Sequence, residues 1–352
     1  MKKYLLFFIA AGICLQACKE DGMEIPKPNT LADSPAPEND SWVLLDDNIL
    51  ADESDHFDQH GFGFAIGTRG YLSGGGYEYS SQFKEYDPET KVMSVKKGRF
   101  DYTSGSVAFG IGSMGYAGSG TKIAGGGELY SIPDFYQYNP QTDTWTAKAP
   151  LPEHLSEAIG FSLNGKGYIG VGRTDTIRFN DSGQLATYFY PSRSFYEYSP
   201  ASNCWIKKAD FPGEVRIHAV AFTIGDKAYV GTGLKFDETG ALKDFWEYDP
   251  NSDKWTKKAD FPGASRYDAV GFSVASKGYI GTGQSYKTAG PEINHKDFWE
   301  YDPLTNSWTQ IGDFAGGFRR QMVYFSTPTK GYVAGGQYEG ERFDFWEFDP
   351  SK

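Results

Sequence analysis

A short aromatic motif recurs six times along the chain, and no other feature limits the fold as strongly. Its clearest copies read DFWEYDPNSDKW at residues 244–255 and DFWEYDPLTNSW at residues 297–308. The copies begin at phenylalanines that are 47 to 60 residues apart: Phe83, Phe135, Phe195, Phe245, Phe298 and Phe345. A period of this length indicates repeated structural units that stack or close into a ring.

A second motif precedes each copy, and it consists of a tyrosine followed four residues later by a glycine. The six tyrosines are Tyr71, Tyr116, Tyr168, Tyr229, Tyr279 and Tyr332. An alternating apolar run such as AVGFSV comes before each tyrosine, and the chain is rich in glycine, with 43 residues. Alternation marks half-buried strands, while Gly and Asp-Pro mark turns. Each unit therefore contains four strand-like segments, which predicts an all-β, six-bladed propeller with four antiparallel strands per blade.

The chain resembles the kelch-repeat family over residues 42–352. The resemblance rests on the alternating run, the Tyr-plus-Gly motif, the Tyr-Asp-Pro and Trp positions, and Arg266 lying 13 residues before Tyr279. One departure is the glycine doublet, which only the first and sixth units keep, whereas the other four read Gly-x-Gly. The resemblance implies a kelch-type propeller.

The two ends of the repeat region predict how the ring closes. The sixth copy of the motif stops at Lys352, before its Trp strand, while SWVLLDD with Trp42 stands before the first strand of the first unit. We expect residues 41–47 to supply the missing outer strand of blade six, which removes an exposed edge.

The N-terminal residues predict export and lipid attachment. Residues 1–17 have a basic start and a short apolar run, as in a signal peptide. The following LQAC resembles the lipobox of bacterial lipoproteins, which implies lipidation at Cys18. KED at residues 19–21 is similar to surface-export signals, so we expect an outer-membrane, cell-surface location. Residues 18–40 are rich in Pro and acidic residues and predict a flexible tether, with residues 41–352 as the propeller.

Charge and cysteine content narrow the partners. The formal net charge is −12, and it becomes −14 without Lys2 and Lys3 of the signal peptide. An acidic protein is a poor partner for nucleic acid or for an anionic lipid surface, so we expect membrane attachment through the lipid anchor only. We expect no intramolecular disulfide, because Cys204 is the only cysteine besides Cys18 in the processed chain, and we expect a monomer.

Alignment of the six units on their tyrosines reveals two sets of candidate site residues. Eleven residues before the tyrosine, where kelch units usually have Gly, stand His60, Gly105, Glu157, His218, Asp268 and Gln321. Thirteen residues before it stand Asp58, Thr103, Leu155, Arg216, Arg266 and Arg319. Both positions lie just before the innermost strand, so we expect a polar ring at the mouth of the channel.

Two interpretations of this ring stay open. The three arginines can brace neighbouring loops, and the other polar residues can form a hydrogen-bond network between blades. Alternatively, Arg216, Arg266 and Arg319 bind an anionic group, because guanidinium forks suit carboxylates. In that case the acids Glu157 and Asp268, with His60 and His218, would bind sugar hydroxyls or move protons. Long segments at residues 119–133, 173–193 and 284–296 are candidate recognition loops.

Several chemistries find no support in the sequence. There is no H-x-x-x-H or C-x-x-C motif, so we expect no metal, and no cofactor of any kind. Galactose oxidase shares the kelch architecture but uses copper with a Cys–Tyr cross-link, whereas Cys204 falls in an outer-strand segment. The glycine-rich GSGTKIAGGGE lacks the Gly-Lys-Ser/Thr ending of a phosphate loop.

These observations favour a lipid-anchored binding module whose channel mouth takes a glycan or protein ligand, acidic groups being favoured. The alternative is an enzyme, because the chain is similar at fold level to the kelch-type mutarotase (epimerase) of sialic acid. Glu157, His218 and Arg216 would then be catalytic. A third option is a scaffold whose flat face, rather than its mouth, contacts a partner.

Overall fold

The computed structural model describes residues 40–47, 58–75, 82–98, 103–123, 128–180, 183–286 and 293–352, which belong to a unit spanning Ala36–Lys352. The predicted signal peptide, Cys18 and the predicted tether up to residue 39 lie outside these ranges, as does the side chain of His60. Every regular element in the described ranges is a β-strand. Accordingly, these ranges contain no helix with the length and apolar character needed to cross a membrane.

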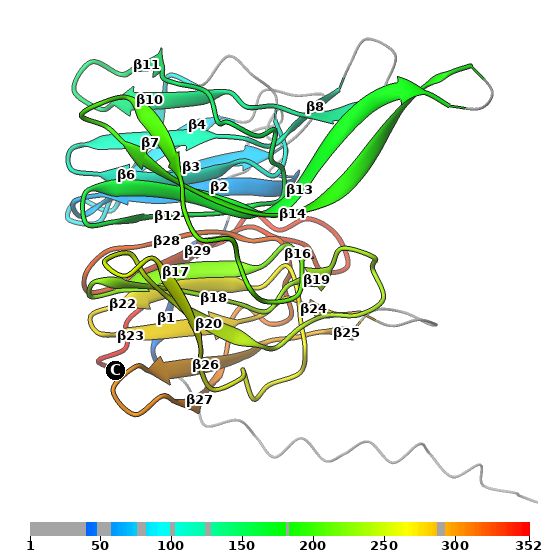
Figure 1. Ribbon diagram of the computed structural model, residues 1–352. Helices are drawn as coiled ribbons and strands as arrows, with labels where there is room; N and C mark the ends of the chain where they lie inside the picture. Colours follow the sequence, from blue (N-terminus) through cyan, green and yellow to red (C-terminus); the bar gives the residue numbers. More distant parts are fainter. Residues whose placement is uncertain are drawn as a thin grey trace, which may run out of the picture. The chain divides into compact units, whose positions relative to one another are not determined.

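Six four-stranded antiparallel sheets form the blades of a propeller (Figure 1), which confirms the predicted fold class. Blade one contains β2 (Asp58–Ile66), β3 (Arg69–Gly75), β4 (Phe83–Asp87) and β5 (Val92–Lys96). Blade two contains β6 (Val107–Ile111), β7 (Met114–Gly118), β10 (Phe135–Asn139) and β11 (Thr144–Ala147). Blade three contains β12 (Ile159–Leu163), β13 (Lys166–Phe179), β14 (Leu185–Ser199) and β15 (Cys204–Lys207).

The remaining three blades follow the same order from the innermost to the outermost strand. Blade four contains β17 (Val220–Ile224), β18 (Lys227–Gly231), β20 (Phe245–Asp249) and β21 (Lys254–Lys257). Blade five contains β22 (Val270–Val274), β23 (Lys277–Gly281), β26 (Asp297–Asp302) and β27 (Ser307–Asp313). Blade six contains β28 (Val323–Ser326), β29 (Gly331–Ala334), β30 (Phe345–Phe348) and, from the other end of the chain, β1 (Trp42–Asp46).

The ring closes as the sequence predicts, through an N-terminal outer strand in blade six. β1 pairs antiparallel with β30, and Trp42 lies opposite Phe348. The Trp42 ring lies 5.0, 4.8 and 4.9 Å from the rings of Phe298, Phe314 and Phe348. Phe348 belongs to the C-terminal strand, so this contact joins the two ends of the ring. Phe298 lies in blade five and Phe314 directly follows its outer strand, so the same side chain also links blades five and six.

Small hairpins and one long arm extend from the same end of the blades, which we call the mouth face. β8 (Thr121–Ile123) pairs with β9 (Leu129–Ser131), β16 (Arg216–Ile217) with β19 (Leu234–Lys235), and β24 (Gln284–Ser285) with β25 (Ile293–Asn294). In blade three, β13 and β14 continue past the blade as a two-stranded arm, visible at the upper right of Figure 1. The candidate loop at residues 173–193 is therefore an ordered ribbon for most of its length.

The aromatic motif packs between neighbouring blades, and it also carries a repeated polar latch. In blade four, Tyr248 donates a 2.7 Å hydrogen bond to Asp253, which stands in a left-handed turn with a φ of 53°. The backbone amide of Ala209 in the preceding connection donates to the same carboxylate at 3.0 Å, and Trp255 donates to the Ala209 carbonyl at 3.0 Å. Equivalent contacts centre on Asp143, Asn203 and Asn306. The motif thus serves packing and blade-to-blade attachment.

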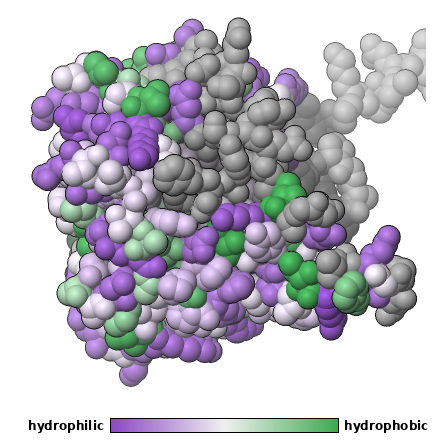
Figure 2. Space-filling model, turned by 90° about the horizontal axis from the view of Figure 1, so that it is seen from above, coloured by the Kyte–Doolittle hydropathy of each residue, from purple (hydrophilic) through white to green (hydrophobic). Residues whose placement is uncertain are grey.

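The face seen from above shows no large apolar patch among the described residues (Figure 2). Seen from above, the described surface is mostly hydrophilic, and its hydrophobic residues form small, separate patches (Figure 2). The channel is therefore the better candidate for a ligand site.

Candidate functional site

A left-handed backbone bend precedes the innermost strand in at least five blades. The residues at this bend have φ angles between 52° and 66°: Gly105, Glu157, His218, Asp268 and Gln321. Non-glycine residues rarely adopt this conformation, which costs on the order of 1 kcal/mol each, and such positions concentrate at functional sites. Five of the six residues that the alignment places 11 positions before the tyrosine thus share one backbone conformation, and four of these are non-glycine residues under strain. The side chain of His60, the sixth, lies outside the described part of the chain.

Polar side chains from blades three to six form a continuous chain of contacts around the mouth. Arg173 contacts Glu157 at 2.6 Å, and His218 lies between two carboxylates, 3.5 Å from Glu157 and 3.2 Å from Asp268. Asp268 also accepts hydrogen bonds from Gln284 at 3.0 Å and from Gln321 at 3.2 Å. Arg320 donates to the Gln284 side chain at 2.6 Å. We call these seven residues the polar arc.

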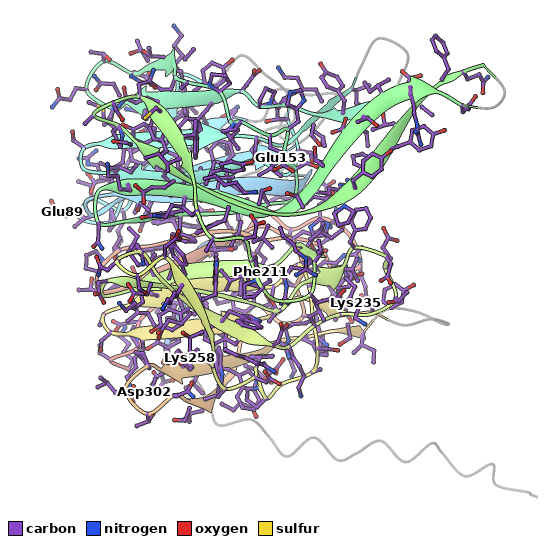
Figure 3. The ribbon with its side chains drawn as sticks, in the orientation of Figure 1. Glu89, Glu153, Phe211, Lys235, Lys258 and Asp302 are labelled. Atoms are coloured by element: carbon purple, nitrogen blue, oxygen red, sulfur yellow. The ribbon has the colours of Figure 1, made fainter. Side chains whose placement is uncertain are left out.

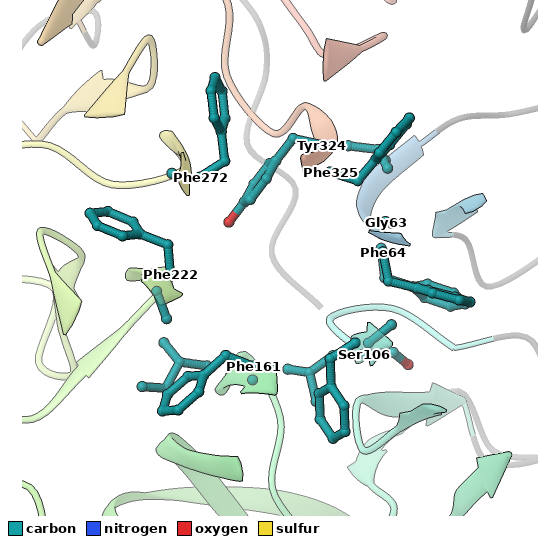
Figure 4. Close-up of a pocket in the computed structure, with 18 of the residues that line it drawn as sticks. Gly63, Phe64, Ser106, Phe161, Phe222, Phe272, Tyr324 and Phe325 are labelled. Carbon is teal, nitrogen blue, oxygen red and sulfur yellow. The ribbon is translucent and has the colours of Figure 1, made fainter. Parts of the chain in front are cut away.

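A cavity of about 360 Å³ occupies the channel beneath the polar arc, lined by Glu157, His218, Asp268 and Gln321 at the mouth. Deeper in, the lining consists mostly of the innermost strands (Figure 4). The volume lies near the lower end of the range for small-molecule pockets, about 300–1,000 Å³. A pocket with polar groups at its rim and small residues below suits a small ligand that enters from the mouth face.

Glu157 has hydrogen-bonding capacity to spare. Its Oε2 atom is buried and forms no hydrogen bond with any residue that the structure describes, and the same holds for Nε of Arg173. A buried carboxylate oxygen without a partner is costly, on the order of 1–3 kcal/mol. Glu157 lines the cavity, so a small shift of its side chain would let Oε2 accept a hydrogen bond from a ligand hydroxyl group.

The three predicted arginines lie inside the blades and do not line the cavity. Arg216 is fully buried, and its two terminal nitrogens each donate a 2.7 Å hydrogen bond to Asp244. It also donates to the carbonyl of Thr232 at 3.0 Å, and its guanidinium lies 4.9 Å from the ring centre of Phe211. Burial raises the pKa of the Asp244 carboxyl, but Arg216 outweighs burial and the net pKa is lowered.

Arg266 and Arg319 repeat this arrangement in the next two blades. Arg266 is fully buried and donates to Asp297 at 2.8 Å, and Arg319 donates to Asp344 at 2.8 Å. The placement of Arg216, Arg266 and Arg319 at the mouth, which the sequence analysis expected, is thus corrected: they brace their own blades, because an aspartate of the same blade takes each guanidinium group.

Arg320 and Tyr324 were not among the residues predicted from the sequence, and Arg173 and Gln284 were included only as the first residues of the candidate loops at 173–193 and 284–296. Arg173 and Gln284 each follow a Gly-x-Gly segment, at a position that pairs with the residue before the left-handed bend. Arg320 and Tyr324 flank the start of the innermost strand of blade six. Alignment of the residue after each Gly-x-Gly segment would have revealed Arg173 and Gln284. Among the described residues, no group of three or more His, Cys, Asp or Glu side chains is arranged to hold a metal ion.

The hairpin formed by β24 and β25 contains a histidine that predicts acid sensitivity. His295 lies 2.7 Å from the Ser285 hydroxyl, and burial, with Arg266 nearby, lowers its pKa from 6.5 to about 4. The neutral imidazole therefore stabilises the fold above pH 6.5, and this contribution, on the order of 2 kcal/mol after allowance for partial exposure, is lost as the pH falls to about 4. We expect His295→Gln to flatten the dependence of the unfolding free energy on pH between 6.5 and 4.

Denaturant titrations at several pH values in this window check this prediction. Asp297, the neighbouring carboxylate, has a pKa held below its usual value by Arg266 despite burial, so it stays ionised throughout. An identical pH slope in the wild type and the variant would contradict the assignment.

Comparisons with known proteins agree with the architecture. No family model matches the chain. A segment of 123 residues is 29% identical to Beta-scruin of Limulus polyphemus, a kelch-repeat protein, and this match covers 35% of the chain and only 12% of Beta-scruin. The solved structure of YjhT matches with a TM-score of 0.68 at 14% identity, covering 82% of this chain and 93% of that one. These likenesses confirm the kelch-type repeat and the six-bladed propeller predicted from the sequence.

Proposed function

We propose that the channel mouth is a glycan-binding site in which the polar arc hydrogen-bonds sugar hydroxyl groups. The observation that carries this proposal is the buried Oε2 atom of Glu157 at the rim of the cavity, which forms no hydrogen bond with a described residue and lies 3.5 Å from Nε2 of His218. Carboxylates, an imidazole, amides and guanidinium groups within one arc supply both acceptors and donors in fixed directions. A sugar offers hydroxyl groups that both donate and accept, so it can satisfy a mixed set of this kind better than an apolar ligand.

Acidic glycans stay in the proposed ligand class, but the arginines that favour them are not the three predicted from the sequence. The arginines of the polar arc are Arg173 and Arg320, whereas the three predicted arginines are paired inside their blades. A ligand carboxylate would compete with Glu157 for Arg173 and would lie near Asp268. We therefore expect hydroxyl groups to supply most of the binding energy and an acidic group to add selectivity.

The alternative function is sugar mutarotation at the same mouth. Opening and closing a sugar ring requires a general acid and a general base close together. The contacts of His218 with Glu157 and Asp268, at 3.5 and 3.2 Å, bring such groups within reach of one ligand. Arg216, which the sequence analysis included, is replaced in this proposal by Arg173, because Arg173 is the arginine in contact with Glu157.

We further propose that Cys18 carries a lipid anchor in the outer membrane and that the propeller stands at the cell surface. Only the sequence of residues 1–40 supports this proposal. Incorporation of a labelled palmitate analogue into the expressed protein, with loss of the label in Cys18→Ser, is the expected result. A protein that takes up no label would exclude the anchor.

Saturation-transfer NMR of the purified protein with N-acetylneuraminic acid, galactose, glucose and N-acetylglucosamine tests the proposed site. We expect binding of at least one sugar, weakened about 10- to 100-fold in Glu157→Gln, as for loss of a hydrogen bond to a charged group. Exchange between the anomer signals in the same samples reports mutarotation. Accelerated exchange that disappears in Glu157→Gln would establish the alternative, whereas binding without exchange supports a recognition module.

Glu89→Gln is the matched control, because Glu89 is an exposed turn residue of blade one at the end of the blades opposite the mouth face (Figure 3). It should leave sugar binding unchanged. If none of the sugars binds the wild type, or if Glu157→Gln binds as tightly as the wild type, the glycan proposal fails and a protein ligand becomes the leading account.

A further inference from the structure

One blade breaks the repeat at the wall of the channel. The second residue of the conserved part of each innermost strand is small in five blades, where it is Gly63, Ala108, Gly160, Ala221 or Gly271. Blade six has Tyr324 at this position. Figure 4 shows its ring turned into the channel, with the hydroxyl group toward the centre.

The close approach of neighbouring blades explains why the position is small in five blades and where the side chain of Tyr324 can lie. A Cβ atom added to Gly271 would lie 2.5 Å from the Val220 side chain, and one added to Gly63 would lie 2.4 Å from the carbonyl oxygen of Tyr324. Because the space between innermost strands is this small, a large side chain at the position has room only in the channel. Tyr324 is partly buried against the hydrophobic cluster that includes Val270 and Phe272 of blade five, and it also lines the channel.

The phenol of Tyr324 is a hydrogen-bond donor across the whole physiological range. Burial raises its pKa to about 12, although a hydrogen bond with the backbone of Gly271 partly opposes this rise. The phenol therefore keeps its proton and can donate a hydrogen bond.

We propose that Tyr324 narrows the channel below the polar arc and donates a hydrogen bond to the ligand at this level (Figure 4). This inference rests on the proposed function and specifies its ligand. Without Tyr324, this position of the innermost strands would hold only Gly or Ala, and the channel would be wider here. With Tyr324 in place, the pocket takes the terminal unit of a glycan, or a free monosaccharide, and not an internal segment.

Two substitutions separate the bulk of Tyr324 from its hydroxyl group. Tyr324→Ala installs the residue that blades two and four have at the equivalent position, so we expect it to fold. Tyr324→Phe keeps the ring but removes the donor. With the best-binding sugar from the set above, we expect affinity for the monosaccharide to fall about 2- to 10-fold in Tyr324→Phe, and further in Tyr324→Ala.

The pattern of saturation transfer along a linear trisaccharide of the same sugar tests the size limit. In the wild type, transfer should concentrate on one terminal unit, and in Tyr324→Ala it should spread along the chain. Unchanged affinity and an unchanged pattern in Tyr324→Ala, together with weakened binding in Glu157→Gln, would overturn this inference and leave the glycan site standing. Absence of sugar binding in the wild type would overturn both. Circular dichroism melting of each variant identifies any loss that comes from unfolding alone.

Discussion

Replacing Arg266 with alanine is expected to lower the free energy of unfolding by about 3–5 kcal/mol, the cost typical of removing one partner from a buried ion pair. Arg266 is fully buried and donates to Asp297 at 2.8 Å. It also donates to the carbonyl of Thr282 at 2.9 Å, and Thr282 is held in a left-handed conformation with a φ of 58°. The variant therefore leaves a buried carboxylate without its cation and a strained turn without its brace.

Arg69→Ala is the matched control for this prediction. Arg69 also contacts two carboxylates, those of Glu85 and Asp87, but its side chain is 50% exposed. Glu85 is buried but keeps a second cation, Lys96 at 3.2 Å, and the Arg69 guanidinium is half exposed, so the control should cost about 0–1 kcal/mol. Chemical denaturation followed by tryptophan fluorescence measures both variants. Similar losses for Arg69→Ala and Arg266→Ala would contradict the claim that burial decides the cost.

A double variant distinguishes the ion pair from the shape of the site. Replacement of both partners, as in Arg266→Met with Asp297→Leu, removes the unpaired charge that the single variant leaves behind. We expect the double variant to be more stable than Arg266→Ala. If the double variant is as unstable as the single one, the bonds to the Thr282 and Ala264 carbonyls, and not the charge pair, carry the stabilisation.

The arginines also show why the fold could be predicted more fully than the site. The repeat period, the alternation and the turn residues are local features that recur in all six copies. Variation in one copy therefore does not change the predicted fold. The role of an arginine depends on which partner reaches it across the blade. The sequence does contain a hint, because blades four to six, which have the arginine, all have aspartate directly before the aromatic motif, at Asp244, Asp297 and Asp344. Blade two has Asp134 without the arginine, so the hint alone does not decide the pairing.

The mouth was predicted in part for the same reason. Glu157, His218, Asp268 and Gln321 share one aligned position, so a single alignment found all four. Arg173, Gln284 and Arg320 come from other positions and differ from blade to blade. Their contacts depend on the distance between neighbouring hairpins, which the sequence does not state. Tyr324 is visible in the sequence as the one large residue at a position that is small in the other blades. Its role could not be predicted, because the sequence does not show that this position faces the channel.

Truncation of Trp42 to alanine should destabilise the propeller by about 3–5 kcal/mol, the usual cost of removing a buried aromatic side chain. Trp42 is 6% exposed and contacts the rings of Phe298, Phe314 and Phe348. It comes from the far end of the chain, so the loss should act on ring closure and not only on local packing. Without a firmly held β1, the strand β30 becomes the exposed outer edge of blade six, and free edges promote association between chains.

Leu44→Ala separates the two contributions, because Leu44 lies on the same strand but is 45% exposed. We expect this control to cost well under half of the Trp42→Ala loss, since little apolar surface leaves water at Leu44 when the chain folds. Thermal unfolding gives the stability ranking, and size-exclusion chromatography of the folded proteins detects association through the open edge. If Trp42→Ala and Leu44→Ala unfold at the same temperature and both remain monodisperse, then the strand closes the ring through its backbone pairing with β30, and the aromatic cluster contributes little to closure.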